Sequence, residues 1–427
     1  MTYEAHVPQP HPATPLSGVT AVGLWAIFIS LIFLQRFAIG GVPIGYGLSY
    51  AAIVAFVLLG ALVIDVTFLI FFLIAVAIAC LSIFWWPADV SIGSFLYLIS
   101  IYALYMLRFR NREATLAKAH DIFLNCMVLA AIIGIVQFAL QFVIGAEAVF
   151  PLETLPESLL AANYNVIIPL TYGSAIVKSN GVFFLEPSFF SQFLAVALLL
   201  EMLGRQRAVR CLLYLSAMVL SYSGTGMLTV LLFAPFVLAR RFSLPIVLGA
   251  VIVTVVVLLS ATVLEFDTLF GRVEEFAAPE SSGFARFISP FYLIRDFLLP
   301  SPDNFLFGMG PGTITDALQK ATFHAYLAHD PTWIKLLFEY GLVGGLAILS
   351  YVIAASYTGS PDRLFTTVLL VVWSILGGYL LNGLMNVLIL SLAVLHGRTA
   401  VPAFEPTPAT THRVPRGRPL GAHRLTH

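Results

Sequence analysis

The sequence predicts an all-α polytopic membrane protein of about twelve transmembrane helices, with a large loop on one side of the membrane. Of its 427 residues, 59% are hydrophobic and only 10% are charged. Soluble domains carry about 25% charged residues. Apolar stretches of about 20 residues, each long enough to cross about 30 Å of hydrocarbon, recur along the chain. Composition and these repeated stretches together define the class.

Twelve apolar segments are predicted to span the membrane, and they define a transmembrane domain over residues 19–397. They are 19–36, 46–64, 66–85, 90–107, 122–145, 186–203, 208–223, 225–239, 243–263, 333–355, 364–380 and 383–397. Very short connections near Asp65, Gly224 and Leu381 leave ten or eleven spans as alternatives. Residues 1–18 contain four prolines and no basic residue, so we expect a disordered cytoplasmic tail and no signal peptide.

The distribution of lysine and arginine between the predicted loops gives the orientation. With both termini in the cytoplasm, 15 of the 22 basic residues face the cytoplasm, namely Arg108, Arg110, Arg112, Lys118, Arg205, Arg207, Arg210, Arg240, Arg241, Arg363, Arg398, Arg413, Arg416, Arg418 and Arg424. Residues 398–427 then form a basic cytoplasmic tail. The long connections 146–185 and 264–332 lie outside, and long structured loops are usually functional.

Composition also argues against several classes of protein. The formal net charge is zero, which gives no indication of a nucleic-acid partner. Cys80, Cys126 and Cys211 all lie in apolar segments without the spacing of a disulfide framework or a zinc site. We find no internal repeat, which weakens the interpretation as an inverted-repeat transporter.

The first polar cluster, KSNGVFFLEPSFFSQFLA, covers residues 178–195 and enters the sixth predicted span. Pro187 falls near the first helical turn, and Ser188, Ser191 and Gln192 place polar groups at the outer end of that helix. One interpretation is an interfacial loop in which Lys178 snorkels and Glu186 helps to cap a helix. The other is a pocket wall at which Lys178 binds an anion.

The second cluster is SYSGTG, residues 221–226, between the seventh and eighth predicted spans. Ser221 and Ser223 lie beside two glycines. The segment is interpreted as a tight hairpin, or as a break whose N–H groups and hydroxyls hold a phosphate or sugar oxygen.

The third cluster fills the larger outer loop. Arg272, Arg286 and Arg295 are the arginines of this loop. Arginine binds phosphate in a bidentate manner, although salt bridges to nearby carboxylates are the alternative. His329 precedes the tenth span, where an imidazole can take a proton from a hydroxyl or simply hydrogen-bond at the surface. The glycines of FLFGMGPG (305–312) indicate backbone flexibility or a close approach.

Acidic and amide side chains within the predicted spans complete the candidates. Glu186 and Glu339 are suspected of function, because acids in a membrane are costly and usually face a polar cavity. Gln137 and Gln141, one helical turn apart, are expected to hydrogen-bond between helices. Orientation places all three clusters at the outer face, and this co-location carries more weight than any single motif.

At these residues the chain resembles the Wzy / O-antigen ligase superfamily of bacterial polysaccharide polymerases and ligases. KSNGVFFLEPSFF resembles the family's basic-x-x-Gly-x-Phe-x-x-x-Pro element, and SYSGTG resembles its Ser-rich break. The stretch from Arg286 through FGMGPG to HDPTWIKLLFEYGLVG resembles its Arg, Phe-Gly-x-Gly-Pro-Gly and His-Asn-x-x-(x)-Leu-x-x-Gly-Leu-x-Gly pattern. The motifs cover roughly residues 170–346, and the last element is the most specific.

Three departures from the family pattern favour an exopolysaccharide-type polymerase over a lipid A-core ligase. Lys178 stands where ligases often carry Arg, Gly224 where many members have Arg, and Asp330 in place of the frequent Asn. A lysine is a point charge, so Lys178 is a less secure phosphate ligand than an arginine.

The resemblance implies a GT-C-like glycosyltransferase at the periplasmic face of the bacterial cytoplasmic membrane. It would join repeat units carried on undecaprenyl pyrophosphate into exopolysaccharide or O-antigen, without a cofactor or metal. Arg286, Arg272 and Lys178 would hold the pyrophosphate, with Arg295, Ser221 and Ser223 as further binding candidates. His329 would accept the proton of the acceptor hydroxyl, with Glu186 as the alternative base. Its partners would be the lipid-linked glycan, membrane lipid and other polysaccharide assembly and export proteins.

Two other functions stay open. A ligase would move a finished glycan to lipid or protein. A transporter or flippase would carry an amphiphilic substrate unchanged and place functional charges near the bilayer midplane, whereas here the charges crowd the outer boundary.

Overall fold

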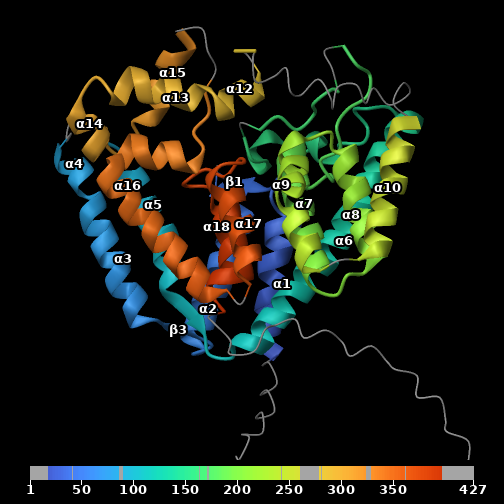
Figure 1. The fold of residues 1–427 in the computed structure, drawn as a ribbon, viewed down its shortest axis with the longest axis horizontal. Helices are drawn as coiled ribbons and strands as arrows, with labels where there is room; N and C mark the ends of the chain where they lie inside the picture. The colour runs from blue at the N-terminus through green and yellow to red at the C-terminus, as the bar shows by residue number, and fades with distance from the viewer. Residues whose placement is uncertain are drawn as a thin grey trace, which may run out of the picture.

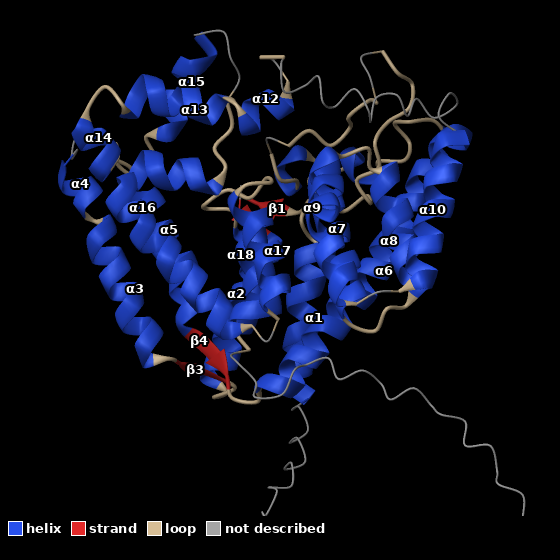
Figure 2. Cartoon of the chain, in the orientation of Figure 1, coloured by secondary structure: helices blue, strands red, loops and turns tan. Residues whose placement is uncertain are grey.

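The computed structural model describes residues 18–40, 42–85, 90–162, 164–170, 173–241, 243–259, 278–279, 281–323, 328–360 and 362–396. This part of the chain is mostly helical, with two small sheets and several loops (Figures 1 and 2). Arg272 and the two predicted tails lie outside the described residues, except that Gly18 begins the first helix.

A helix occupies each of the twelve predicted segments. In chain order these are α1 (Gly18–Phe33), α2 (Ile44–Leu58), α3 (Val66–Ala79) with α4 (Leu81–Trp85), α5 (Ile92–Ala103), α6 (Arg112–Ile144), α7 (Pro187–Leu203), α8 (Ala208–Leu220), α9 (Gly224–Arg240), α10 (Leu244–Leu259), α16 (Thr332–Gly359), α17 (Arg363–Ser374) and α18 (Gly383–Ile389). Within the described residues, three helical stretches are long and apolar enough to cross a membrane, namely Val66–Trp85, Arg112–Ile144 and Thr332–Gly359. Twelve crossings therefore stay a prediction, since most of the other apolar helices are shorter.

Short elements fill the connections. They are η1 (Leu104–Met106), η2 (Pro151–Thr154), η3 (Glu157–Leu159), α12 (Ser282–Phe287), α13 (Ser289–Leu293), η5 (Ile294–Leu298), α14 (Pro302–Phe307), α15 (Ile314–Phe323) and η6 (Leu390–Val394). Strands β1 (Ala38–Ile39) and β2 (Val42–Pro43) pair antiparallel, as do β3 (Leu62–Ile64) and β4 (Leu107–Phe109). In the second sheet Val63 is opposite Arg108. The sequence did not predict these strands, which shorten the predicted spans 46–64 and 90–107.

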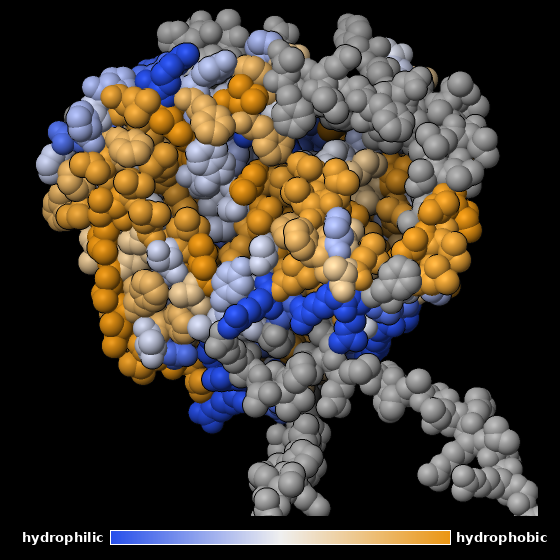
Figure 3. Space-filling view, in the orientation of Figure 1, coloured by the Kyte–Doolittle hydropathy of each residue, from blue (hydrophilic) through white to orange (hydrophobic). Residues whose placement is uncertain are grey.

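The connections gather at two opposite ends of the helix bundle. One end carries α12 to α15 and the segment 145–186, and we call it the loop end (Figure 1). The opposite end carries β3 and β4, and we call it the arginine end. There Arg240 pairs with Asp362 at 3.0 Å and Arg205 pairs with Asp121 at 3.0 Å. Figure 3 shows hydrophilic residues along this end, below a broad apolar belt.

Helix α7 lies at the centre of the core. Every residue of α7 except Ser188 is buried, and the helix packs against α8 and α9. A mostly apolar helix that is buried on every side is stable only when other parts of the protein surround it. By contrast, α3 buries only Phe68, Phe72, Ala75 and Ala79, at helical spacing, and leaves an apolar face exposed. Such an exposed apolar face is typical of a helix that contacts lipid.

Helix α16 is broken at Gly341, and the glycine-rich segment after α14 fills the break. Gly341 has φ 65° and ψ −175°, so the carbonyls of Phe338 and Glu339 lose helical partners. They accept instead from Met309 N at 2.8 Å and Gly310 N at 3.0 Å. A Cβ on Gly308, which has φ +78°, would lie 2.4 Å from Gly341 N. The close approach predicted from FLFGMGPG is therefore confirmed, and it is a contact between two backbones.

This contact predicts that Gly341→Ala destabilises the fold. The new Cβ would lie 2.3 Å from Leu306 O, and alanine is strained at φ +65°. We expect a loss of about 1–3 kcal/mol, seen as a lower unfolding temperature of the detergent-purified protein. Gly47→Ala is the matched control, because a Cβ on this helical glycine would meet no atom within 4 Å. Equal unfolding temperatures for the two variants would contradict this account of the break.

Candidate functional site

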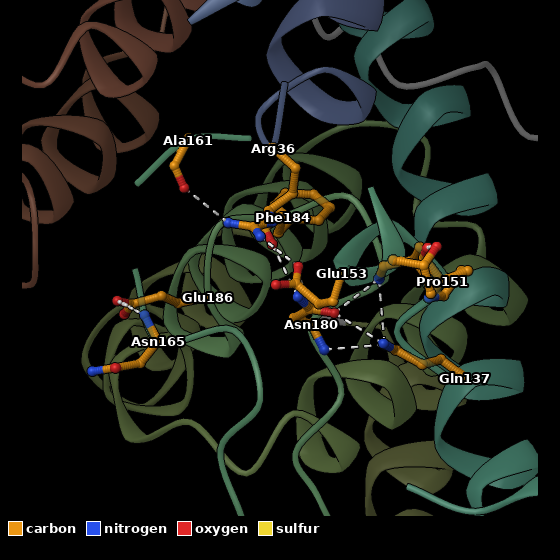
Figure 4. A network of polar contacts seen from close by, with 11 residues as sticks. Arg36, Gln137, Pro151, Glu153, Ala161, Asn165, Asn180, Phe184 and Glu186 are labelled. Carbon is orange, nitrogen blue, oxygen red and sulfur yellow. Dashed lines mark hydrogen bonds and ion pairs between the residues drawn. The ribbon is translucent and has the colours of Figure 1, made fainter. Parts of the chain in front are cut away.

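The long segment 145–186 is held on the end of α6 by the amide of Gln137 (Figure 4). Gln137 Nε2 donates to Val149 O at 3.2 Å and to Asn180 Oδ1 at 3.0 Å. Gln137 Oε1 accepts from Ser179 Oγ and Asn180 N. Asn180 Nδ2 then donates to Phe184 O at 3.0 Å. The prediction that Gln137 joins two helices is wrong, because its amide instead satisfies the backbone of the loop beside α6.

An ion pair between a buried arginine and a partly exposed glutamate fixes the other part of this segment. Arg36, only 3% exposed, pairs with Glu153 and donates from Nη1 to Ala161 O at 3.2 Å (Figure 4). A buried guanidinium needs such a partner, because it loses its hydration on folding. Specific hydrogen bonds and this ion pair therefore hold the segment 145–186 in place at the loop end.

Glu186 lies where this segment enters α7. Pro187 is the first residue of the helix, as predicted. Glu186 Oε1 accepts from Asn165 N at 3.2 Å, and Oε2 accepts from Ser188 Oγ at 3.1 Å (Figure 4). Its carboxylate makes no side-chain cap to the N–H groups of α7. The carboxylate is thus held beside the helix entrance, where it faces the surrounding loops.

Arg286 and His329 come together although 43 positions separate them. His329 N donates to Ala285 O at 3.0 Å, which places the imidazole beside the last turn of α12. Burial lowers the pKa of His329, and the positive charge of Arg286 lowers it further, to about 4. The imidazole is therefore neutral at pH 7 and able to accept a proton.

Tyr379 lies in the connection between α17 and α18. The preceding residue, Gly378, accepts through its carbonyl from Thr332 N at 3.1 Å, three positions after His329. At Gly377, a Cβ would lie 3.6 Å from Arg286 Nη1. We call Glu186, Arg286, His329 and Tyr379, which all lie at the loop end, the loop-end cluster. It combines one cation, one anion, a neutral imidazole and a phenol.

The start of α16 carries a buried ion pair beside this cluster. Lys335 Nζ lies 2.7 Å from Glu339 Oε1 and 3.7 Å from Asp330 Oδ2. Burial raises the pKa of Asp330, and Lys335 opposes that rise. Glu339 is fully buried, and its partner is a lysine of its own helix. One oxygen of Glu339 is therefore held by Lys335, whereas Oε2 is buried without a hydrogen-bond partner among the described residues.

The Ser-rich break packs against α7. Ser221 Oγ donates to Met218 O at 2.6 Å, and Ser223 Oγ lies 3.1 Å from Thr225 Oγ1. Gly226 N donates to Ser191 Oγ at 2.9 Å. Because these hydroxyls are buried and engaged within the protein, the geometry favours the hairpin interpretation of SYSGTG.

The structure places Lys178 and Arg295 at separate positions. Lys178 N donates to Ile168 O at 2.9 Å, next to Val177 N, which donates to Gln141 Oε1. Lys178 therefore lies at the loop end of α6. Arg295, on η5, is exposed, pairs with Asp296 at 2.6 Å and lies 4.8 Å over the ring of Tyr292. Arg272 lies outside the described residues.

Sequence reasoning missed Tyr379 and gave Gln192 no specific role. Tyr379 lies among apolar residues of the predicted span 364–380, and no motif marks it. Gln192 was noted only as one of several polar residues at the start of its helix. The feature that could have marked Gln192 in the sequence is an amide within a mostly apolar helix.

Neither the protein-family models nor the curated proteins that were searched contain a match to this chain. Among the described residues, no group of three or more His, Cys, Asp and Glu side chains is arranged to hold a metal ion.

The low pKa of His329 is directly measurable. In histidine-labelled protein, with His329→Gln used to assign the signal, we expect its NMR titration midpoint near pH 4, because burial and Arg286 disfavour the cation. The unfolded chain binds this proton near pH 6.5. His329 therefore makes the protein less stable as the pH falls from about 6.5 towards 4.

Arg286→Gln should raise this midpoint, because it removes the cation beside the imidazole. Lys320→Gln, which removes an exposed charge of α15 at the same end, is the control and should leave the midpoint unchanged. A midpoint near 6.5 in the unmodified protein would contradict a buried imidazole, and an unchanged midpoint in Arg286→Gln would show that Arg286 does not act on it.

Proposed function

We propose that the protein is a glycosyltransferase that joins oligosaccharide repeat units, carried on undecaprenyl pyrophosphate, at the periplasmic face of the bacterial cytoplasmic membrane. The observation that carries the proposal is the hydrogen bond from His329 N to Ala285 O, which brings a neutral imidazole to the residue next to Arg286. The family resemblance of the surrounding motifs supports it, as does the excess of basic residues in the loops predicted to be cytoplasmic.

In the proposed reaction, a hydroxyl oxygen of the acceptor sugar forms a bond to the anomeric carbon of the donor. The bond from that carbon to the phosphate oxygen breaks, and its electron pair leaves with the pyrophosphate. The hydroxyl proton passes to His329, which is neutral and so has a free nitrogen lone pair. Arg286 stabilises the negative charge that grows on the leaving pyrophosphate, and such electrostatic stabilisation is usually the largest catalytic contribution.

Glu186 is the alternative proton acceptor, since its carboxylate is held at the entrance of α7 by Asn165 N and Ser188 Oγ. Lys178 and Arg295 are weaker candidates for binding pyrophosphate, because Lys178 lies at the end of α6 and Arg295 already pairs with Asp296. The proposal places the phosphate at Arg286.

The test is polymer assembly from lipid-linked repeat units by the purified protein. Arg286→Ala and His329→Ala should each lower the rate by at least about 100-fold, the usual effect of losing a charge-stabilising or proton-transfer group. Lys320→Ala is the matched control, because Lys320 is an exposed cation at the same end, and it should retain the rate. Full activity in either cluster variant would remove that residue from the mechanism.

The products separate the alternatives. A polymerase converts single repeat units into a ladder of lengths, a ligase makes one transfer, and a transporter leaves the lipid-linked unit chemically unchanged. We expect a ladder. Chelation of divalent ions should leave its formation unchanged, and loss of the ladder with EDTA, restored by Mg²⁺ or Mn²⁺, would contradict a metal-independent reaction.

A further inference from the structure

Gln192 presents a buried hydrogen-bond acceptor beside Arg286. The side chain is 2% exposed, and Nε2 donates to Leu376 O at 3.0 Å. Because Leu376 O is an acceptor, it fixes the orientation of the amide and turns Oε1 away from that bond. Gln192 Oε1 is buried without a hydrogen-bond partner among the described residues. A buried acceptor left in this way is costly for the folded protein.

Arg286 presents a buried hydrogen-bond donor, which complements the acceptor of Gln192. Its Nε is also buried without a hydrogen-bond partner in the described part of the chain. The two side chains meet at Gly377, which has φ +138°. A Cβ at Gly377 would lie 2.5 Å from Gln192 Nε2 and 3.6 Å from Arg286 Nη1. The absence of a side chain at Gly377 therefore lets an amide and a guanidinium approach the same point.

One donor and one acceptor, both buried and both unpaired, specify the chemistry of a ligand. Arg286 Nε requires an acceptor, such as a phosphate oxygen. Gln192 Oε1 requires a donor, which a pyrophosphate does not offer once it is ionised. On a glycosyl pyrophosphate, the donor nearest to the phosphate is the substituent on C2 of the attached sugar, a hydroxyl or an acetamido N–H.

We propose that Gln192 binds the C2 substituent of the sugar attached to the pyrophosphate, and that it is the residue by which the enzyme selects its donor sugar. This inference rests on the proposed function and deepens it. A site that hydrogen-bonds a hydroxyl discriminates against an analogue without it, since the buried acceptor is then left unpaired. Hydrogen bonds to a C2 hydroxyl also strengthen as positive charge develops at the anomeric carbon.

A purely structural role for Gln192 is the competing explanation, because its bond to Leu376 O alone braces α7 against the connection after α17. The two explanations differ in substrate dependence. A structural brace affects every substrate equally, whereas a C2 contact is lost only with substrates that carry the C2 group. A comparison of two substrates in two enzymes isolates this pairwise interaction.

The experiment uses synthetic polyprenyl-pyrophosphate-linked repeat units with either the native group or hydrogen at C2 of the first sugar. We compare kcat/KM for the two substrates in the wild type and in Gln192→Leu. The native-to-deoxy ratio should be about tenfold smaller in the variant, the effect of one hydrogen bond. This ratio also cancels the intrinsically different reactivity of the deoxy sugar, because both enzymes share it.

Gln206→Leu is the matched control. Gln206 likewise donates to backbone carbonyls, those of Met202 and Arg241, but at the arginine end. It should keep the wild-type ratio. If Gln192→Leu does not purify as a folded protein, Gln192→Asn withdraws the amide by one methylene group while keeping it polar, and it should also lower the ratio.

An unchanged ratio in a folded Gln192 variant would overturn the inference and leave the proposed function standing, because polymer is still made. A wild-type protein that joins neither substrate would instead remove the proposed function, and the inference with it.

Discussion

The contact between Gly308 and Gly341 is the constraint on which the loop end depends. A helix that crosses a membrane normally satisfies its own backbone, so a break must find other partners for the freed carbonyls. Here Met309 N and Gly310 N provide them. The same segment reaches α5, since Ser91 N donates to Pro311 O at 2.7 Å. The first half of α16 is therefore held as a separate unit, with its N-terminal residue Thr332 at the loop-end cluster.

That fixed half-helix orders the neighbouring connections. Thr332 N and Oγ1 both donate to Gly378 O, and Oγ1 also donates to Trp373 O at 2.8 Å. The chain between α17 and α18 is consequently bound to the start of α16, which positions Gly377 and Tyr379. Arg286 arrives from α12 through the bond between His329 N and Ala285 O. Four segments far apart in the sequence thus converge through backbone hydrogen bonds, which tolerate little displacement.

A feature could be predicted from the sequence when the residues that determine it lie close together in the chain, and not when they lie far apart. The length of the apolar segments located the helices, because each span must by itself be long enough to cross the hydrocarbon of the membrane. The glycines of FLFGMGPG predicted a close approach, since glycine is required where a Cβ does not fit. Their partner Gly341 was not predictable, because the contact joins two motifs about 30 residues apart. The partners of Gln137 were predicted wrongly for a similar reason: an amide at the end of a helix bonds to a helix or a loop according to the path of a distant segment.

The candidate site residues likewise fall into those that the sequence indicated and those that only the folded structure reveals. Arg286 and His329 were selected by residue type and by loop, and the structure places them together. Tyr379 has no motif, and only the hydrogen bond from Thr332 N to Gly378 O brings its segment to the start of α16. Gln192 is conspicuous only once its Oε1 is known to be unpaired, which is a property of the folded chain. Sequence therefore indicates the reactive groups, whereas the groups that orient a substrate emerge from packing.

The pairing of a cation with a proton acceptor has a consequence for the proposed reaction. In the protein alone, burial and the charge of Arg286 lower the pKa of His329, so the imidazole is neutral but a weak base. A pyrophosphate bound to Arg286 brings negative charge to the same place and offsets that effect, because a nearby anion favours the protonated imidazole. The basicity of His329 then rises when the donor binds, at the moment when the acceptor hydroxyl must lose its proton. The interaction that prepares the leaving group thus also strengthens the base.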